Sequence, residues 1–328
     1  MEEWGALDYL ILKILITGGL GLIGGRLGYF LSDKGHNVTL ATRANSPNLR
    51  KNLSSGRSLN IKTIDWNNIK QIESLCASNE LVIHSAGMNA HECSLNPEIA
   101  ISSAVFNAAQ LVKAALNSNV QKFIYLSSAH VYSSNLEGFI DEGTPTLNEH
   151  PYAKAHLSAE KEIINLENNR KIRPLVLRLS NCFGYPVFKN NNAWKLVAND
   201  LCKQAAKTKK LIIKSDRFAQ RDFLPIDLFC KTLNSFIGKK NFFDEKSKII
   251  NIGSGVSFSI FSLAQKIQQI TEEIMGIYPE IVFTEKNLKE LRSDLQYQSK
   301  FLKIQKNKFD KAFNQEIEML LDHCTLNH

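Results

Sequence analysis

The sequence predicts an α/β protein in which a doubly wound parallel sheet carries a smaller α+β lobe. Three observations support this prediction. Short apolar runs alternate with helical patterns through the first half of the chain, which is typical of βαβ units. Several runs, such as 123–126, are apolar at successive positions, as strands are when helices cover both faces of a sheet. After about residue 185 the pattern becomes irregular, and we expect the smaller lobe there.

The first half supplies the strands of the sheet and the helices between them. We expect strands at 13–17, 37–42, 60–64, 81–84, 122–127 and 174–179, and helices at 22–34, 69–76, 100–117 and 152–167. Each of these helices separates two strands, which allows the strands to run parallel. We therefore assign residues 13–180 to the sheet domain.

The second half supplies shorter elements. We expect strands at 211–213, 249–252 and 280–284 and helices at 194–206, 258–271 and 311–324. Residues 181–328 then form a discontinuous smaller lobe, with segments near 220–253 returning to the sheet domain.

Composition and charge exclude several classes of protein. The chain has 328 residues, 44% hydrophobic and 22% charged, so it can bury a large core and is neither disordered nor collagen-like. The longest early apolar run is interrupted by Lys13 and the N-terminus is acidic, so we expect a cytoplasmic protein without a membrane span. The net charge of +8 is scattered over the chain, which argues against nucleic acid as a partner.

The six cysteines show neither Cys-x-x-Cys spacing nor an accompanying histidine cluster. This pattern is typical of reduced thiols, and we expect no disulfide framework and no metal site.

A glycine-rich turn follows the first expected strand. Gly18, Gly21 and Gly24 are spaced three residues apart and lead into a helix. Glycine allows a left-handed turn and lets the backbone approach a pyrophosphate, which the amide groups at the helix N-terminus then bind. After a strand in a βαβ series, this spacing predicts the dinucleotide site of a Rossmann fold. Leu20, Leu22 and Ile23 complete the loop.

The second and third expected strands carry residues that would meet the adenosine. The second strand lacks the acidic residue that usually binds the ribose of NAD and ends beside Arg43, which favours NADP, with NAD as the alternative. Arg43 as a solvated surface residue is the other interpretation. Asp65 and Trp66 follow the third strand, where the carboxylate either accepts from the adenine amino group or caps the strand end.

The ordered motifs along residues 13–295 resemble the extended short-chain dehydrogenase/reductases, and within them the NAD-dependent epimerase/dehydratase group that acts on nucleotide sugars. They lie at 17–24, 82–87, 126–132, 151–152, 178–181, 221–223 and 292–294. The resemblance implies that Ser85, Ala86 and Gly87 line the cofactor and that the protein is a homodimer through the helices at 100–117 and 152–167.

The same resemblance assigns catalytic roles. Ser128 corresponds to the hydroxyl residue that binds the reacting sugar oxygen, and Tyr152 to the acid/base that exchanges a proton during hydride transfer. The family's lysine, one helical turn after the tyrosine, is replaced here by His156. Lys154 lies on nearly the opposite helix face and cannot substitute for it. His156 could still bind the nicotinamide ribose, with three outcomes open: an enzyme that works with His156, an enzyme that is slow or has a shifted pH optimum, or a protein that has lost redox chemistry.

The resemblance also names substrate residues. Arg221 and Arg292 correspond to arginines that bind the substrate diphosphate, which suits the bidentate chemistry of guanidinium, and Asn181 corresponds to an asparagine of the same region. His91 and His130 lie in segments that contact substrate in related proteins.

Several reactions remain open. Ala129 and His130 stand where the dehydratases of the family carry an acidic pair, which disfavours dehydration. C4 epimerisation and C4 keto reduction of a nucleotide-diphosphate sugar both fit the remaining residues. The alternatives are a reductase of another carbonyl substrate and a non-catalytic NAD(P)-binding sensor or scaffold that lost the catalytic lysine.

Overall fold

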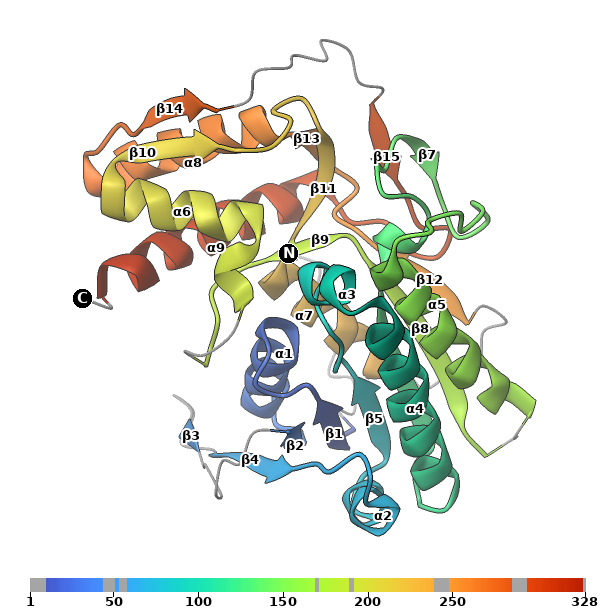
Figure 1. The fold of residues 1–328 in the computed structure, drawn as a ribbon. Coiled ribbons are helices and arrows are strands. Elements are labelled where there is room, and N and C mark those ends of the chain that lie inside the picture. The colour runs from blue at the N-terminus through green and yellow to red at the C-terminus, as the bar shows by residue number, and fades with distance from the viewer. Residues whose placement is uncertain are drawn as a thin grey trace.

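The structure is a computed structural model that describes residues 10–43, 51–52, 58–168, 171–188, 192–238, 248–284 and 294–326. Its centre is an eight-stranded sheet in the order β12-β8-β6-β5-β1-β2-β4-β3 (Figure 1). The strands are β1 (Lys13–Thr17), β2 (Asn37–Thr42), β3 (Lys51–Asn52), β4 (Ser58–Thr63), β5 (Leu81–His84), β6 (Lys122–Ser128), β8 (Arg173–Leu179) and β12 (Ile249–Ile252). Neighbouring strands pair in parallel except β3 with β4. The doubly wound Rossmann fold is therefore confirmed.

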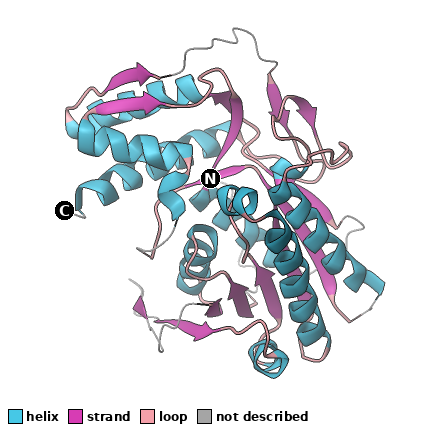
Figure 2. Cartoon of the chain, in the orientation of Figure 1, coloured by secondary structure: helices cyan, strands magenta, loops and turns pink. Residues whose placement is uncertain are grey.

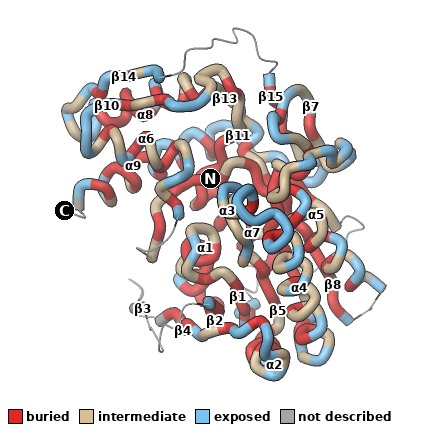
Figure 3. Tube along the Cα trace, viewed as in Figure 1, coloured by how far each residue is buried: buried red, intermediate tan, exposed pale blue. Residues whose placement is uncertain are grey.

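Helices cover both faces of the large sheet (Figure 2), and alternate strand residues pack into two different cores. In β1, Ile14 and Ile16 pack in the core that includes α1 (Leu22–Asp33) and α7 (Ile226–Ile237). Leu15 faces the other side, in a second core. That layer consists of α2 (Ile69–Ala77), α4 (Pro97–Leu116) and α5 (Pro151–Ile164). The strands are consequently buried on both faces (Figure 3), which explains their continuous apolar runs.

The remaining elements build smaller sheets and helices beyond the carboxyl ends of the large sheet. One sheet contains β9 (Asn181–Phe183), β11 (Gln220–Pro225) and β13 (Ser257–Ser259), a second β10 (Lys210–Ile213) and β14 (Glu280–Phe283), and a third β7 (Gly138–Ile140) and β15 (Leu295–Tyr297). The helices are α3 (Ala90–Leu95), α6 (Val197–Thr208), α8 (Ile260–Met275) and α9 (Lys306–Leu326). Of the segments expected to return near 220–253, β12 joins the large sheet beside β8, whereas β11 pairs with β9 and β13.

One helix corrects an expectation from the sequence. Among the described residues, α4 is long and apolar enough to cross a membrane by length and composition, although no segment was expected to pass that test. Length and composition are weak evidence, since a helix that covers a sheet passes as well. Ala108 and Leu111 of α4 are buried in the core against the sheet, while Ile99 and Phe106 are exposed.

The cysteine side chains lie in the interior of the protein. All six thiols are free and buried, and burial raises the pKa of several of them, for example that of Cys76 to about 12. Within the described parts of the chain, no group of three His, Cys, Asp or Glu side chains is arranged to hold a metal ion.

Candidate active site

The glycine turn between β1 and α1 forms a cradle without side chains. Gly18 adopts φ +70°, and a Cβ atom there would lie 2.8 Å from the backbone nitrogen of Ala86. At Gly24 a Cβ atom would lie 2.5 Å from the carbonyl oxygen of Gly18. The N-cap of α1 is Gly21, and no side chain caps the helix. The first amide groups of α1 are therefore available to an anion, and these residues fit the pyrophosphate of a dinucleotide.

This cradle lies at the point where the strand order reverses. β1 pairs with β2 on one side and β5 on the other, and ligands of open α/β sheets bind at such a point. The Ser85 hydroxyl, just after β5, donates to the carbonyl oxygen of Thr17 at 2.6 Å and ties the two strand ends together. Around this contact lie the half-buried Leu20, Leu22, Ile23 and Ala86 and the exposed Gly87.

The residues expected at the adenosine end follow β2 and β4. Arg43 is exposed and comes directly after β2. Asp65 is exposed as well, and its carboxylate accepts the amide N–H of Asn67 at 3.0 Å. Trp66 is buried, with its ring 5.9 Å from that of His84 in an edge-on arrangement. The Asp65 contact is that of a turn cap.

Ser128 and Tyr152 meet at the carboxyl end of β6. Ser128 is the last residue of that strand, and Tyr152 is the second residue of α5. His150 caps α5 by accepting the amide N–H of Tyr152 at 3.1 Å, and Pro151 begins the helix. Burial raises the pKa of Tyr152, and a side-chain hydrogen bond with Ser128 opposes that rise. The structure thus brings the two expected catalytic hydroxyl groups together.

His156 lies one turn after Tyr152, with the ring centroids 4.6 Å apart and the planes at 77°. Its Nδ1 atom is 2.7 Å from the hydroxyl oxygen of Tyr125, a buried residue of β6. Burial lowers the pKa of His156 to about 4, helped by the nearby His130. The ring is therefore neutral at pH 7, unlike the lysine that the family carries here.

Lys154 does not approach this position. Its ammonium group forms an ion pair with Glu149 at 2.5 Å, and its side chain is 45% exposed. This confirms that Lys154 does not replace the missing lysine.

A buried ion pair fixes α5 against the sheet one turn beyond His156. Both carboxylate oxygens of Glu160 accept from Arg178 of β8, at 3.0 and 2.7 Å. Ser127 donates to the same carboxylate at 2.5 Å. Because Tyr152, His156 and Glu160 share one helix face, this anchor sets the position of the catalytic side chains.

Three of the expected substrate residues lie together. Burial lowers the pKa of His130, as does the charge of Arg221, while a side-chain hydrogen bond with Asn181 opposes the change. Asn181 itself donates to the carbonyl oxygen of Asp222 at 3.2 Å. His91 is exposed on α3, and Arg292 lies outside the described residues.

Sequence reasoning missed two polar residues that support this site, Tyr125 and Glu160. Tyr125 was considered only as one residue of an apolar strand. Tyr125 shares its strand face with Phe123, in the core that contains α5, and its contact with His156 depends on the tertiary structure. Glu160 was detectable as an acid eight residues after Tyr152 on the same helix face.

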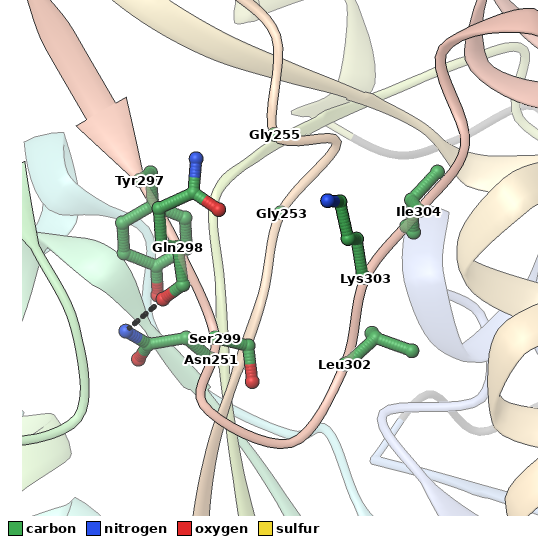
Figure 4. Close-up of a pocket in the computed structure, with 9 residues that line it drawn as sticks. All are labelled: Asn251, Gly253, Gly255, Tyr297, Gln298, Ser299, Leu302, Lys303 and Ile304. Atoms are coloured by element: carbon green, nitrogen blue, oxygen red, sulfur yellow. Dashed lines mark hydrogen bonds between the residues drawn. The ribbon is translucent and has the colours of Figure 1, made fainter.

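A polar cavity of about 100 Å³ lies between β12, β15 and the adjoining loops (Figure 4). The hydroxyl groups of Ser128 and Tyr152 do not line it. It is lined by residues of β12, β15 and the adjoining loops: Asn251, Gly253, Gly255, Tyr297, Gln298, Ser299, Leu302, Lys303 and Ile304. Within it, the side-chain amide of Asn251 donates to the carbonyl oxygen of Gln298 at 3.0 Å. The meeting of Ser128 and Tyr152, and not this cavity, marks the candidate active site.

Comparisons with known proteins agree with this geometry. The human dTDP-D-glucose 4,6-dehydratase is 24% identical over 286 residues, which cover 83% of this chain and 77% of that protein. UDP-N-acetylglucosamine 4-epimerase from Methanobrevibacter ruminantium has the same fold, with a TM-score of 0.76, 20% identity and coverage of 95% of this chain and 99% of that one. UDP-glucose 4-epimerase from Bifidobacterium longum gives a TM-score of 0.73, 20% identity and coverage of 96% and 98%.

The family assignment rests on a match to a family model. A sequence model of the NAD dependent epimerase/dehydratase family matches residues 14–253. Because this match spans the glycine turn, the catalytic hydroxyl groups and β12, the chain belongs to the NAD dependent epimerase/dehydratase family.

Proposed function

We propose that this protein is an NAD(P)-dependent enzyme that epimerises or reduces a nucleotide-diphosphate sugar at C4 by hydride transfer. The observation that carries the proposal is the meeting of Ser128 and Tyr152 at the carboxyl ends of the strands, beside the glycine cradle. The relatives support the substrate class, since those described above are named for their action on dTDP- and UDP-sugars.

The chain's own residues handle the proton. A bound dinucleotide supplies or accepts the hydride, while the Tyr152 hydroxyl gives a proton to the C4 oxygen of the sugar or takes one from it. Ser128 holds that oxygen by a hydrogen bond. Burial raises the pKa of Tyr152, so the phenolate needs stabilisation. Its place in the first turn of α5 supplies part of it, because the positive end of the helix dipole favours a negative charge there.

The substrate side is proposed from the residues at the start of β9 and β11. Arg221 and Asn181 lie near His130, so a diphosphate bound by the guanidinium would place the sugar close to the catalytic hydroxyl groups. Arg292 is proposed as the second diphosphate ligand.

Epimerisation or reduction is favoured over dehydration. Several relatives are named dehydratases, yet the turn after Ser128 contains no acid. Ala129 is buried, and His130 is held among Asn181 and Arg221. With its pKa lowered, His130 lacks a proton to give at neutral pH, so elimination of water has no acid there.

The cofactor and the assembly are proposed on separate grounds. Arg43 follows β2 and is exposed, so it is available to the 2′-phosphate of NADP, although the Bifidobacterium longum epimerase was solved in complex with NAD+. A homodimer is proposed through α4 and α5, because Ile99 and Phe106 of α4 leave 61% and 43% of their surface exposed.

The first test is to denature the purified protein and identify the released small molecules by mass spectrometry. NADP or NAD would establish the cofactor, and a released nucleotide diphosphate would support the substrate class. The native protein, supplied with the dinucleotide so identified, is then incubated with UDP-, dTDP- and GDP-sugars and the C4 products are followed by NMR. Tyr152→Phe should abolish turnover, whereas Tyr278→Phe, at a residue 63% exposed, should not.

The outcomes separate this proposal from its alternatives. A protein that binds a dinucleotide tightly but converts no nucleotide sugar, and binds no nucleoside diphosphate, would be a sensor or a reductase of another carbonyl. A protein that binds neither dinucleotide would contradict the proposal altogether.

A further inference from the structure

The replacement of the lysine by His156 is accompanied by a second polar residue on the neighbouring strand. Tyr125 of β6 faces α5, is 4% exposed, and its hydroxyl oxygen lies 2.7 Å from Nδ1 of His156. The two rings lie 5.8 Å apart at 43°. His84, the partner of Tyr125 on the neighbouring strand β5, lies 5.5 Å from the tyrosine ring. The ring of Tyr125 thus packs against two histidine rings, which fixes the direction of its hydroxyl.

The direction of this hydrogen bond follows from the available partners. Nδ1 of His156 is the one hydrogen-bond partner that the described part of the chain gives the Tyr125 hydroxyl. Burial raises the pKa of Tyr125 well above its ordinary value, so the phenol keeps its proton. If Nδ1 also carried a proton, the buried O–H of Tyr125 would have no acceptor, which is costly. Tyr125 therefore donates and Nδ1 accepts.

The other ring nitrogen of His156 is open. Within the described residues Nε2 forms no hydrogen bond, and it does not occur among the buried polar atoms that lack a partner. It therefore reaches accessible space, next to the ring of Tyr152. With Nδ1 accepting, the proton of a neutral imidazole is on Nε2.

We propose that Tyr125 is a positioning residue that fixes His156 as the neutral Nε2–H tautomer, so that one oriented N–H donor faces the bound dinucleotide. The part that concerns the dinucleotide rests on the function proposed above. In this arrangement His156 replaces the lysine as a hydrogen-bond donor but not as a positive charge. Tyr125 and His156 act together, because without Tyr125 the imidazole ring could rotate or carry its proton on Nδ1 instead.

The test reads the tautomer directly. Long-range ¹H–¹⁵N NMR spectra of histidine-labelled protein at pH 7 distinguish the two neutral tautomers, and His156→Gln assigns the signal. We expect Nε2–H in the unmodified protein and a mixture or Nδ1–H in Tyr125→Phe. Tyr297→Phe is the matched control, because it removes a buried hydroxyl that donates to the carbonyl oxygen of Arg178 at 2.8 Å and should leave the signal unchanged.

A double-mutant cycle tests the effect on the cofactor. Tyr125→Phe should weaken binding of NAD or NADP by about tenfold, the size of one well-placed hydrogen bond, but should have no effect in the His156→Ala background. An Nδ1–H ring in the unmodified protein, or equal losses in both backgrounds, would overturn the proposal. The spectrum needs no cofactor, so a protein that binds neither dinucleotide but shows the Nε2–H ring would contradict the proposed function and leave the tautomer assignment standing.

Discussion

Arg26 of the first helix and Glu316 of the last form a bidentate ion pair in the interior of the protein. Nη1 lies 2.7 Å from Oε1 and Nη2 3.0 Å from Oε2, and the side chains are 8% and 0% exposed. The guanidinium also stacks 4.1 Å above the ring of Tyr185, whose amide N–H donates to Glu316 at 3.1 Å. Arg26 lies two residues after Gly24, so this ion pair joins α9 to the part of α1 that adjoins the glycine cradle.

Removal of one partner of this pair should destabilise the whole protein. Glu316→Ala leaves a buried guanidinium without its carboxylate, so we expect a loss of about 3–5 kcal/mol in the free energy of unfolding, measured by urea denaturation. The control is Glu280→Ala, which breaks the exposed pair with Lys210 and should cost at most about 1 kcal/mol. Equal effects of the two substitutions would show that the buried pair does not fasten α9.

The glycine cradle should be intolerant of a single methyl group. In Gly24→Ala the new Cβ would lie 2.5 Å from the carbonyl oxygen of Gly18 and 2.8 Å from the Ser85 hydroxyl oxygen. The backbone oxygen cannot move without opening the turn, so we expect a loss of roughly 1–3 kcal/mol in stability. Dinucleotide affinity, measured by calorimetry, should fall by more than about tenfold.

The matched control is Gly238→Ala, at the end of α7. Its φ is −76°, and the nearest atom to a new Cβ is a carbonyl oxygen at an ordinary 3.5 Å. That substitution should preserve both stability and affinity. If Gly24→Ala binds the dinucleotide as well as Gly238→Ala does, the turn is not the pyrophosphate site.

Much of this fold follows from local patterns in the sequence. β1, β2 and β5 have the bounds that the sequence predicts, because a strand that helices cover on both faces is apolar at most of its positions. The glycine spacing likewise predicted the cradle. Short strands such as β9 and β11 were missed, since three to six residues in a lobe with mixed burial have no distinct periodicity.

The candidate site, too, was predicted only in part. The positions of Ser128 and Tyr152 could be predicted from motifs whose spacing the fold fixes. The role of Tyr125 could not, because its contact with His156 joins residues 31 positions apart and depends on the register of β6 against α5. α7 was missed although its buried residues Ile226, Phe229, Leu233 and Ile237 recur at helical spacing, so this helix could have been predicted from the sequence.

Arg221 should discriminate between the two ligands of the proposed function. Arg221→Ala removes a guanidinium near Asn181 and His130, far along the chain from the glycine cradle. We expect nucleoside-diphosphate affinity to fall by about ten- to a hundredfold, as for a lost charge-assisted hydrogen bond, with unchanged dinucleotide affinity. Both constants can be measured by calorimetry on one preparation.

A second arginine of the same lobe provides the control. Arg217 stacks on the rings of Phe218 and Phe283, at 4.9 and 4.5 Å, so Arg217→Ala removes an equal charge without touching the site. If both variants lose nucleoside-diphosphate affinity equally, the effect is one of overall charge, and Arg221 is not a diphosphate ligand.

Asp222 should make stability depend on pH in a way opposite to most carboxylates. Burial raises its pKa to about 6, from 3.8, against hydrogen bonds from Ser180, Ser254 and Gly255. Between about pH 4 and pH 6 the folded state therefore holds a proton that the unfolded state has released. The stability that this group contributes is present below pH 4 and is lost as the pH rises to 6, by about 3 kcal/mol at 1.36 kcal/mol per pKa unit.

The measurement compares the unmodified protein with Asp222→Asn, which keeps the side-chain shape and cannot titrate. The free energy of unfolding of the unmodified protein, minus that of the variant, should fall steadily from pH 4 to pH 6.5 and then remain constant. A difference for Asp222→Asn that is flat, or that rises with pH, would show that the carboxylate is ionised in the folded protein throughout, because the hydrogen bonds outweigh the cost of burial.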